Sequence, residues 1–303
     1  MKVVVAGASG FVGSAVARAL THLGHEVTAL TRHPERYQGA GTPLRADIED
    51  ADSMRRALDG RDAAYYLVHS LAVDDFADRD RAGAKVFADA ATGACLRHVI
   101  YLGGLGDDAD DLSEHLRSRR EVESILLEAA PTTALRAGIV IGDGSISWEI
   151  LRQLVERLPV MVTPRWVQTR TQPIALDDAL HDLTGVLGRP ETIGEIYEIG
   201  GPESMTYRDM MLTVSRIMSR RRLIVPIPLL SPRLSSHWLR LITNVDLRTA
   251  RALVDSMTNE VIVHDDRIGA LLGHSPISFE AAANRALDAR AERIGAAGVR
   301  APA

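Results

Sequence analysis

Three glycines near the start of the chain lie between a strand-like run and a helical pattern. The segment GASGFVG occupies residues 7 to 13, after the apolar run VVVA, and the helical pattern SAVARALTHL follows at 14 to 23. At such a junction Gly7 can form the tight turn, Gly10 allows close approach of a ligand, and Gly13 allows the helix to pack on the strand. Free N–H groups at the start of the helix attract phosphates. The junction therefore predicts a βαβ sheet with a phosphate-binding loop at its first strand.

Apolar runs typical of strands alternate with amphipathic helical patterns through the first half of the chain. The expected strands are at 3–6, 26–30, 43–46, 63–68, 98–102 and 132–136, and the expected crossover helices are at 14–23, 52–60, 78–95 and 113–130. This alternation is typical of parallel sheets whose two faces are covered by helices. We expect an α/β fold, with a Rossmann doubly wound parallel sheet over residues 1–145.

The pattern changes after about residue 145. A proline-rich stretch covers 159–173, and further helices are expected at 147–157, 176–187, 206–219, 232–242, 246–256 and 278–293, with strands at 172–176 and 195–200. We expect residues 146–303 to form mainly a smaller C-terminal α/β substrate lobe, with segments of 160–200 returning to the sheet. The tail GAAGVRAPA at 295–303 is expected to be frayed.

The composition excludes several classes of protein. The net charge is −5 at pH 7, so the chain has no overall attraction for nucleic acid or an anionic membrane. The apolar run LIVPIPLL at 223–230 is broken by two prolines and is too short to span a bilayer. Met1 and Lys2 lead directly into the first strand, so we expect no signal peptide and a cytoplasmic location. The single cysteine, Cys95, excludes an internal disulfide.

The motifs of two common hydrolase classes are absent from the sequence. No cluster of His, Asp or Glu has the spacing of metal ligands, and no GxSxG nucleophile motif occurs. We therefore expect no bound metal. From the sequence as a whole we also expect a small-molecule substrate, no nucleic-acid partner, no transmembrane segment, and either a monomer or a homodimer.

The residues after the second expected strand indicate which dinucleotide binds. A carboxylate at this position accepts from the ribose 2′-OH of NAD, whereas an arginine pairs with the 2′-phosphate of NADP. The position reads Thr31, Arg32 and His33, so NADP(H) is favoured over NAD(H). Two alternatives stay open: Arg32 could be a solvated charge, and Glu35 could reach a 2′-OH. Asp47, in the motif RADIED, is predicted to accept from the adenine amino group, unless it is a plain surface aspartate.

These segments together resemble the atypical and extended short-chain dehydrogenase/reductases. The order GASGFVG, TR and RADIED is similar to their NAD(P)-binding pattern, and LRAGIVIGDGS at 135–145 resembles the segment that closes over the nicotinamide. The segments at 171–179 and 195–207 resemble their substrate-side motifs, and HLRSRREVE at 115–123 is most similar to NmrA-like proteins and to the nucleotide-binding accessory subunit of respiratory complex I. The resemblance covers most of the chain.

The loop and the resemblance together predict a set of cofactor-binding residues. These residues are Gly7, Ser9, Gly10, Phe11, Val12, Gly13, Arg32, Asp47, Ile48, Leu67, Val68, Gly103, Arg119, Ala137, Gly138 and Ile139.

The resemblance also implies catalytic residues, and here the sequence departs from the family. In the family's dehydrogenases a tyrosine transfers the proton, a lysine four residues later lowers the pKa of that tyrosine, and a serine steadies the carbonyl. None of the six tyrosines is followed by a lysine at this spacing; the aligned positions are His115 and Arg119, and the serine region reads LGGLG at 102–106.

The aligned residues leave substitutes for the missing pair. Arg119 could still hydrogen-bond the nicotinamide ribose, and His115 could replace the acid because the ordinary pKa of histidine is about 6.5. His69 follows the fourth strand, where such sheets place ligand-facing residues. Two alternatives are an exposed helix position for His115 and a packed polar role for His69.

The sequence as a whole predicts an NADP(H)-dependent reductase of a small, largely apolar organic substrate. The substrate is expected between the carboxyl edge of the sheet and the C-terminal lobe. Two alternatives stay open because the tyrosine and lysine are missing. The chain could bind NADP(H) as a structural or sensed ligand without turnover, or it could be an isomerase or epimerase with a bound cofactor.

Overall fold

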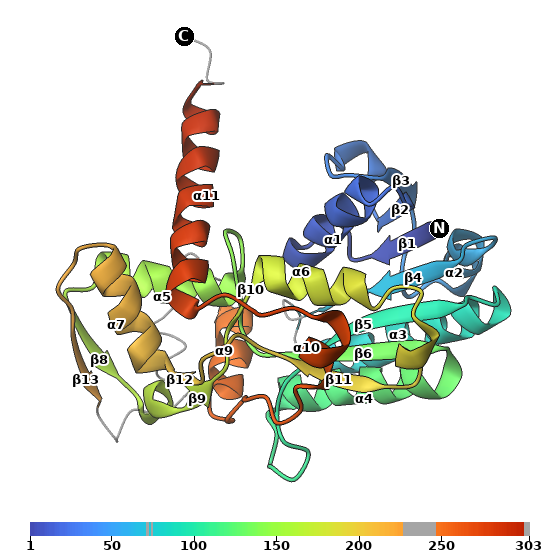
Figure 1. Cartoon of the computed structure of the whole chain (residues 1–303). Helices are drawn as coiled ribbons and strands as arrows, with labels where there is room; N and C mark the ends of the chain where they lie inside the picture. Colours follow the sequence, from blue (N-terminus) through green and yellow to red (C-terminus); the bar gives the residue numbers. More distant parts are fainter. Residues whose placement is uncertain (71–72, 74, 227–246, 300–303) are drawn as a thin grey trace.

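The central element is a sheet of seven parallel strands, seen in a computed structural model that describes residues 1–70, 73, 75–226 and 247–299 (Figure 1). The strand order is β11-β6-β5-β4-β1-β2-β3. The strands are β1 (Lys2–Ala6), β2 (Glu26–Thr31), β3 (Thr42–Arg45), β4 (Ala63–Tyr66), β5 (His98–Gly104), β6 (Thr132–Ala137) and β11 (Ile196–Ile199). Because the order reverses between β1 and β4, their carboxyl ends form the crevice where such sheets bind ligands. The predicted Rossmann fold is confirmed.

Helices cover both faces of this sheet. α1 (Phe11–His22) and α6 (Leu176–Gly185) lie on one face, and α2 (Ala51–Leu58), α3 (Phe76–Gly93) and α4 (Glu114–Ala129) lie on the other. Successive residues of β1 alternate between the two cores, with Val3 packed on one side and Val4 on the other. This double burial explains why the strands are continuous apolar runs in the sequence.

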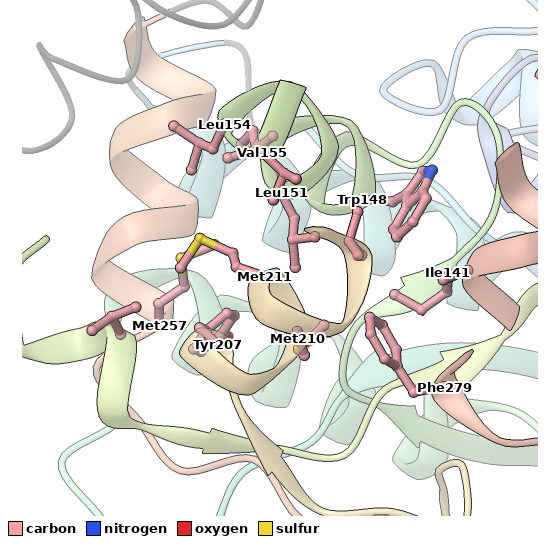
Figure 2. Packing of buried hydrophobic residues seen from close by; sticks show 14 of the residues in the cluster. Ile141, Trp148, Leu151, Leu154, Val155, Tyr207, Met210, Met211, Met257 and Phe279 are labelled. Atoms are coloured by element: carbon pink, nitrogen blue, oxygen red, sulfur yellow. The ribbon is translucent and has the colours of Figure 1, made fainter. Parts of the chain in front are cut away.

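The C-terminal part of the chain adds a lobe with its own apolar core (Figure 2). Its helices are α5 (Ile146–Arg157), α7 (Tyr207–Ile217), α9 (Leu247–Ser256) and α11 (Phe279–Val299). α10 (Arg267–Leu272) returns to the large sheet, where it packs beside β11 and α6. Three short strand pairs join the helices of the lobe: β7 (Val140–Ile141) with β10 (Ile174–Ala175), β9 (Arg170–Thr171) with β12 (Met205–Thr206), and β8 (Val160–Thr163) with β13 (Leu223–Pro226). The domain boundary after residue 145 stays a prediction.

Several expectations for this lobe are corrected. The strand expected at 172–176 is only the two residues of β10, and the proline-rich stretch contains β8 and β9. The LIVP segment forms β13, since Pro226 stands at the end of the strand, where its missing N–H is tolerated. The last helix continues to Val299, because alanines at 296 and 297 favour helix over the expected fraying. The helix expected at 232–242 lies outside the described residues.

One further property concerns membranes. Within the described ranges, no helix is both long and apolar enough to cross a bilayer.

Candidate cofactor and active site

The glycine loop between β1 and α1 has the geometry that a phosphate cradle needs. Gly7 has a φ of +86°, and a Cβ there would lie 2.5 Å from the carbonyl oxygen of Leu67. Gly10 donates its N–H to the Gly7 carbonyl at 2.9 Å and caps the start of α1. A Cβ on Gly13 would overlap the Gly7 carbonyl. Side chains at Gly7 and Gly13 would therefore collide with the backbone, so this loop shape, which fits the pyrophosphate of a dinucleotide, requires glycine at both positions.

A cavity of about 400 Å³ opens beside this loop at the carboxyl edge of the sheet. We call it the sheet-edge cavity. The structure brings together here the predicted cofactor residues Gly7, Ser9, Gly10, Arg32, Asp47, Ile48, Leu67 and Val68. Phe11, Val12 and Gly13 lie in the first turn of α1, beyond this lining, and Phe11 is close to Gly142. The cavity lies at the reversal of strand order, where the fold predicts a dinucleotide.

Charged side chains near the sheet-edge cavity bear on whether Arg32 or Glu35 contacts the ribose of the dinucleotide. Arg32 is exposed and lines the cavity, and among the described residues no carboxylate pairs with it. Glu35 is engaged elsewhere, since its carboxylate pairs with Arg45 at 3.1 Å and with His33 at 3.3 Å. A backbone hydrogen bond and the Arg45 charge hold the pKa of Glu35 below its ordinary value. Arg79, which the sequence did not single out, also lines the cavity.

Two histidines meet at the inner end of the sheet-edge cavity. His69 follows β4 and His115 lies in the first turn of α4, and their Nε2 atoms are 3.0 Å apart. His69 Nδ1 is 2.9 Å from Oδ2 of Asp80, whose side chain is 3% exposed. His115 Nδ1 is 2.7 Å from Oγ of Ser256, the last residue of α9. The structure therefore joins four polar side chains from four separate elements.

Burial determines how these histidines ionise. Desolvation lowers the pKa of His115 well below 6.5, and the neighbouring His69 and Arg119 add to this effect. Desolvation also lowers the pKa of His69, while the hydrogen bond to Asp80 opposes it. Both rings are consequently neutral at pH 7, so the expected exposed position of His115 is not observed.

Arg119 lies at the carboxyl ends of two neighbouring strands. Its guanidinium donates to the carbonyl of Leu102 and, at 3.4 Å, to the carbonyl of Val68. The guanidinium carbon is 5.0 Å from the centroid of the Tyr101 ring. These contacts fix the cation between the sheet-edge cavity and α4, and its contact with a nicotinamide ribose stays a prediction.

A second cavity, of about 90 Å³, lies between the sheet and the C-terminal lobe. We call it the lobe cavity. Its lining is mostly apolar and includes Leu105, Leu116, Tyr207, Leu253, Met257 and Val261 together with His115 and Ser256. The predicted cofactor residues Ala137, Gly138 and Ile139 line it as well. Gly103 faces Tyr101 and Glu123 instead, and Gly104 takes the position on the cavity.

A very small apolar space, of about 10 Å³, lies next to the lobe cavity in the core of the second lobe. It shares Ile139, Ser147, Tyr207 and Met257 with the lobe cavity and reaches Leu154 and Trp166. Figure 2 shows Leu154, Tyr207 and Met257 within this core. Because His69 lines the sheet-edge cavity and His115 lines the lobe cavity, the histidine pair lies between the two spaces.

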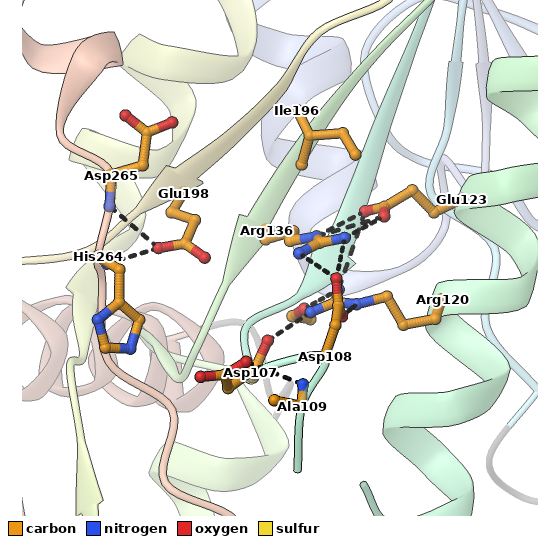
Figure 3. A network of polar contacts seen from close by, with 12 residues as sticks. Asp107, Asp108, Ala109, Arg120, Glu123, Arg136, Ile196, Glu198, His264 and Asp265 are labelled. Carbon is orange, nitrogen blue, oxygen red and sulfur yellow. Dashed lines mark hydrogen bonds and ion pairs between the residues drawn. The ribbon is translucent and has the colours of Figure 1, made fainter.

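An ion-pair network holds the loop after β5, from which Leu105 reaches the lobe cavity (Figure 3). Arg120 donates to the carbonyls of Gly104 and Gly106 at 2.8 and 2.6 Å and also pairs with Asp108. The buried Arg136 pairs with Glu123 at 2.6 Å. Sequence reasoning missed this network because its members are ordinary charged residues until the fold brings them together.

Comparison with known proteins agrees with this geometry. The family described as NAD(P)H-binding matches residues 7–153. The chain is 28% identical over 231 residues to the (4-alkanoyl-5-oxo-2,5-dihydrofuran-3-yl)methyl phosphate reductase of Streptomyces griseus, over 72% of this chain and 74% of that protein. It is 25% identical over 240 residues to the ceramide reductase of Caulobacter vibrioides, over 75% of this chain and 73% of that protein.

The fold is also similar to that of solved structures. A solved structure of a short-chain dehydrogenase/reductase superfamily protein from Agrobacterium tumefaciens, with bound NAD, matches with a TM-score of 0.71 and 16% identity, covering 99% of this chain and 100% of that chain. The glycine cradle and the switch-point cavity define an NAD(P)-binding α/β protein. Residues 7–153 match the NAD(P)H-binding family, and the solved neighbour shares the fold. None of the six tyrosines of the chain is followed by a lysine four residues later. Relatives named as reductases support an oxidoreductase.

Proposed function

We propose that the protein is an NADPH-dependent reductase of a small, largely apolar organic substrate. The observation that carries this proposal is the placement of the histidine pair, with His69 on the sheet-edge cavity and His115 on the lobe cavity. A reductase needs its nicotinamide against the substrate carbon, because hydride passes directly between them, and a proton donor beside the substrate oxygen. The predicted cofactor residues Ala137, Gly138 and Ile139 line the lobe cavity together with His115, so a nicotinamide that reaches this cavity would meet both the substrate and the histidine. When bound, NADPH supplies a hydride.

The choice of NADPH over NADH rests on the charges of the sheet-edge cavity. Arg32 lines this cavity, while Glu35 is paired with Arg45 outside it. Arg79 also lines the cavity, but it is paired at 2.6 Å with Glu49 of the same lining, so Arg32 is the candidate for the 2′-phosphate. A 2′-phosphate accepts charge-assisted hydrogen bonds from arginine, which a 2′-OH cannot match. Asp47 remains the candidate partner for the adenine amino group, because it lines the same cavity.

The substrate side is assigned from the lining of the lobe cavity. Apolar side chains, among them Leu105, Leu253 and Met257, surround His115 and Ser256. This lining favours a carbonyl or activated C=C compound that carries an aliphatic group. The relatives' names support the aliphatic part of this assignment, since one is a reductase of an alkanoyl compound that also carries a phosphate and the other is a ceramide reductase.

Three residues receive roles in this proposal. His115 exchanges a proton with the substrate side, and His69 supports it through their shared hydrogen bond. Arg119, fixed at the ends of β4 and β5, orients the nicotinamide ribose. Histidine is the most common acid or base in such steps, and its substitution for tyrosine preserves the ability to donate a proton.

Consumption of NADPH tests the proposal. Purified protein is incubated with NADPH and a panel of alkyl ketones, enones, quinones and imines, and both NADPH oxidation and product formation are followed. The proposal predicts stoichiometric oxidation with at least one member of the panel. Tight binding of both NADPH and NADP⁺ without turnover of any member would contradict it and would favour a protein that senses the nucleotide.

A further inference from the structure

We propose that Asp80, His69, His115 and Ser256 form a proton store, in which the two imidazoles share one proton and the Ser256 hydroxyl passes it to the substrate. This inference deepens the proposed function and rests on it. Ser256 and His115 line the lobe cavity, whereas Asp80 and His69 lie behind them. Ser256 would be the catalytic contact, and Asp80 would be a positioning residue.

The hydrogen bond to Asp80 fixes the direction of proton donation at one end of this row of four side chains. The Asp80 carboxylate only accepts, so His69 carries a proton on Nδ1. The two Nε2 atoms are 3.0 Å apart, and a single proton must lie between them. In the neutral pair this proton belongs to His115, whose free Nδ1 then accepts from the Ser256 hydroxyl at 2.7 Å.

A second arrangement of the same contacts holds one more proton. In it His69 is an imidazolium that donates from Nδ1 to Asp80 and from Nε2 to His115. His115 then carries its proton on Nδ1 and donates it to Ser256 Oγ. The Ser256 hydroxyl turns to the carbonyl of Ala252, which is 2.8 Å away. Both arrangements keep the same contacts among the four side chains, and Ser113 Oγ can donate to Ser256 Oγ at 3.3 Å in either one. The site can therefore change its charge by one without moving a backbone atom.

The transfer from the charged to the neutral arrangement balances. When a substrate carbonyl carbon receives hydride, the π electron pair of the C=O bond moves to its oxygen, which takes the hydroxyl proton of Ser256. Ser256 Oγ takes the Nδ1 proton of His115, and His115 Nε2 takes the proton from His69 Nε2. The products are an alcohol and a neutral histidine pair. After product release, water in the lobe cavity returns the proton through Ser256. In the reverse direction the neutral pair accepts the proton of an alcohol.

Nearby charges shift the pH at which the histidine pair takes up its extra proton. Asp80 faces the pair from α3 and stabilises the protonated state, while Arg119 faces it from α4 and disfavours that state. Tyr66 on β4 and Tyr101 on β5 lie near Asp80 and Arg119, and burial raises the pKa of both, so they stay neutral. Since burial lowers the pKa of both histidines, reduction is expected to slow as pH rises toward neutrality, and alcohol oxidation is expected to speed up.

The first test reads the histidines directly, without turnover. Side-chain ¹⁵N NMR of the full chain is recorded from pH 4 to pH 8. We expect an Nδ1–H tautomer for His69, an Nε2–H tautomer for His115, and uptake of one proton by the two rings together. In Asp80→Asn this uptake should move to lower pH by about one unit or more, because a compensating charge is lost. Independent titration of the two rings near pH 6.5 would overturn the proposal.

The second test uses turnover. Ser256→Ala should lower kcat by about 10²- to 10⁴-fold, as is typical when a general acid is removed, with the dissociation constant of NADPH unchanged. Asp80→Asn should shift the pH profile of kcat in the same direction as the NMR titration. The matched control is His181→Gln, since His181 and His274 also stack, with centroids 4.1 Å apart, beside Asp178. This control should leave both kcat and the profile unchanged.

The outcomes separate the two proposals. The wild type could turn over while Ser256→Ala keeps its kcat or Asp80→Asn keeps its pH profile. Either result would overturn the proton store without contradicting the proposal that the protein is a reductase. Absence of turnover by the wild type would overturn both. Reduced kcat in Ser256→Ala together with shifted titration in Asp80→Asn supports the store.

Discussion

The sheet-edge cavity and the lobe cavity are assembled from the chain in different ways. Every described residue that lines the sheet-edge cavity lies between Ala6 and Arg79, within the first βαβ units. The lining of the lobe cavity spans Gly104 to Val261 and comes from β5, α4, the end of β6, α5, α7 and α9. The first cavity is thus a local product of strand-to-helix turns, and the second exists only after the C-terminal lobe has packed on the sheet. Changes in the first should alter nucleotide binding, and changes at the apolar side chains of the second, away from Ala137, Gly138 and Ile139, should alter turnover.

The largest effect is expected at the glycine cradle. In Gly7→Val a β-branched side chain would meet the Leu67 carbonyl at a φ of +86°, so the loop must change shape. We expect NADPH affinity to fall by more than about 100-fold, measured by calorimetry, from strain of about 1–3 kcal/mol together with the lost loop contacts. Gly24→Ala is the control, because Gly24 has a φ of +81° and nothing within 4 Å. Unaltered binding in Gly7→Val would contradict a cofactor role for the loop.

The next effect concerns the choice of nucleotide. In Arg32→Ala the dissociation constant of NADPH should rise by about 10- to 100-fold, as expected for loss of a charged hydrogen bond worth about 1.5–3 kcal/mol. The dissociation constant of NADH should not change. Arg36→Ala is the matched control, because Arg36 is an exposed arginine of the same connection that does not line the cavity. Equal loss of both nucleotides, or of neither, would refute recognition of the 2′-phosphate.

A buried histidine away from both cavities, His98, should affect the stability of the protein without affecting nucleotide binding. His98 contacts Thr133 Oγ1 at 2.7 Å and accepts from the Gly188 N–H at 3.1 Å, and burial lowers its pKa to about 4. The unfolded chain, with a histidine pKa of about 6.5, binds more protons between these two values. The free energy of unfolding should therefore fall by about 2 kcal/mol as pH falls from 6.5 to 4.

Urea unfolding of His98→Gln measures this contribution. The variant should lose less stability than the wild type over the same pH range, while its NADPH affinity at pH 7 stays unchanged. His69 and His115 titrate in both proteins, so the difference isolates His98. Identical pH dependence in the two proteins would contradict a buried neutral His98.

The smallest effect is expected in the lobe cavity. Met257 is 6% exposed and lines both this cavity and the space that adjoins it. Met257→Phe should reduce the room for an aliphatic group and lower kcat/KM by about 10-fold, which corresponds to about 1.4 kcal/mol. NADPH affinity should change less than twofold, the reverse of the result for Arg32→Ala. A loss of NADPH affinity with unchanged kcat/KM would contradict the division between the two cavities.

The same contrast explains what the sequence could reveal. The sheet, its crossover helices and most of the glycine-loop residues were predictable, because each depends on residues close together in the chain. Arg32 could be identified because the end of the second strand has a fixed position relative to the loop. By contrast, Ser256 lies 141 residues from His115, and no local pattern distinguishes it from other serines at helix ends.

The histidine pair could be predicted from the sequence only in part. His69 and His115 could each be identified, one from its place after a strand and the other from alignment with the family's tyrosine. Their contact could not be predicted, since it depends on how α3 and α4 pack against the ends of β4 and β5. The strands β8 and β13 were missed for a similar reason, because each is short and stabilised by pairing with a distant partner.

Transfer of deuterium from labelled NADPH tests the central claim most directly. The protein is incubated with an alkyl ketone and with NADPH that carries deuterium at both positions of C4 of the dihydronicotinamide ring, and the product is analysed by mass spectrometry. A reductase with the two cavities in these roles predicts one deuterium on the carbinol carbon, while the hydroxyl proton comes from solvent. NADPH that stays bound and fully labelled, with no deuterium in any product, would contradict the claim.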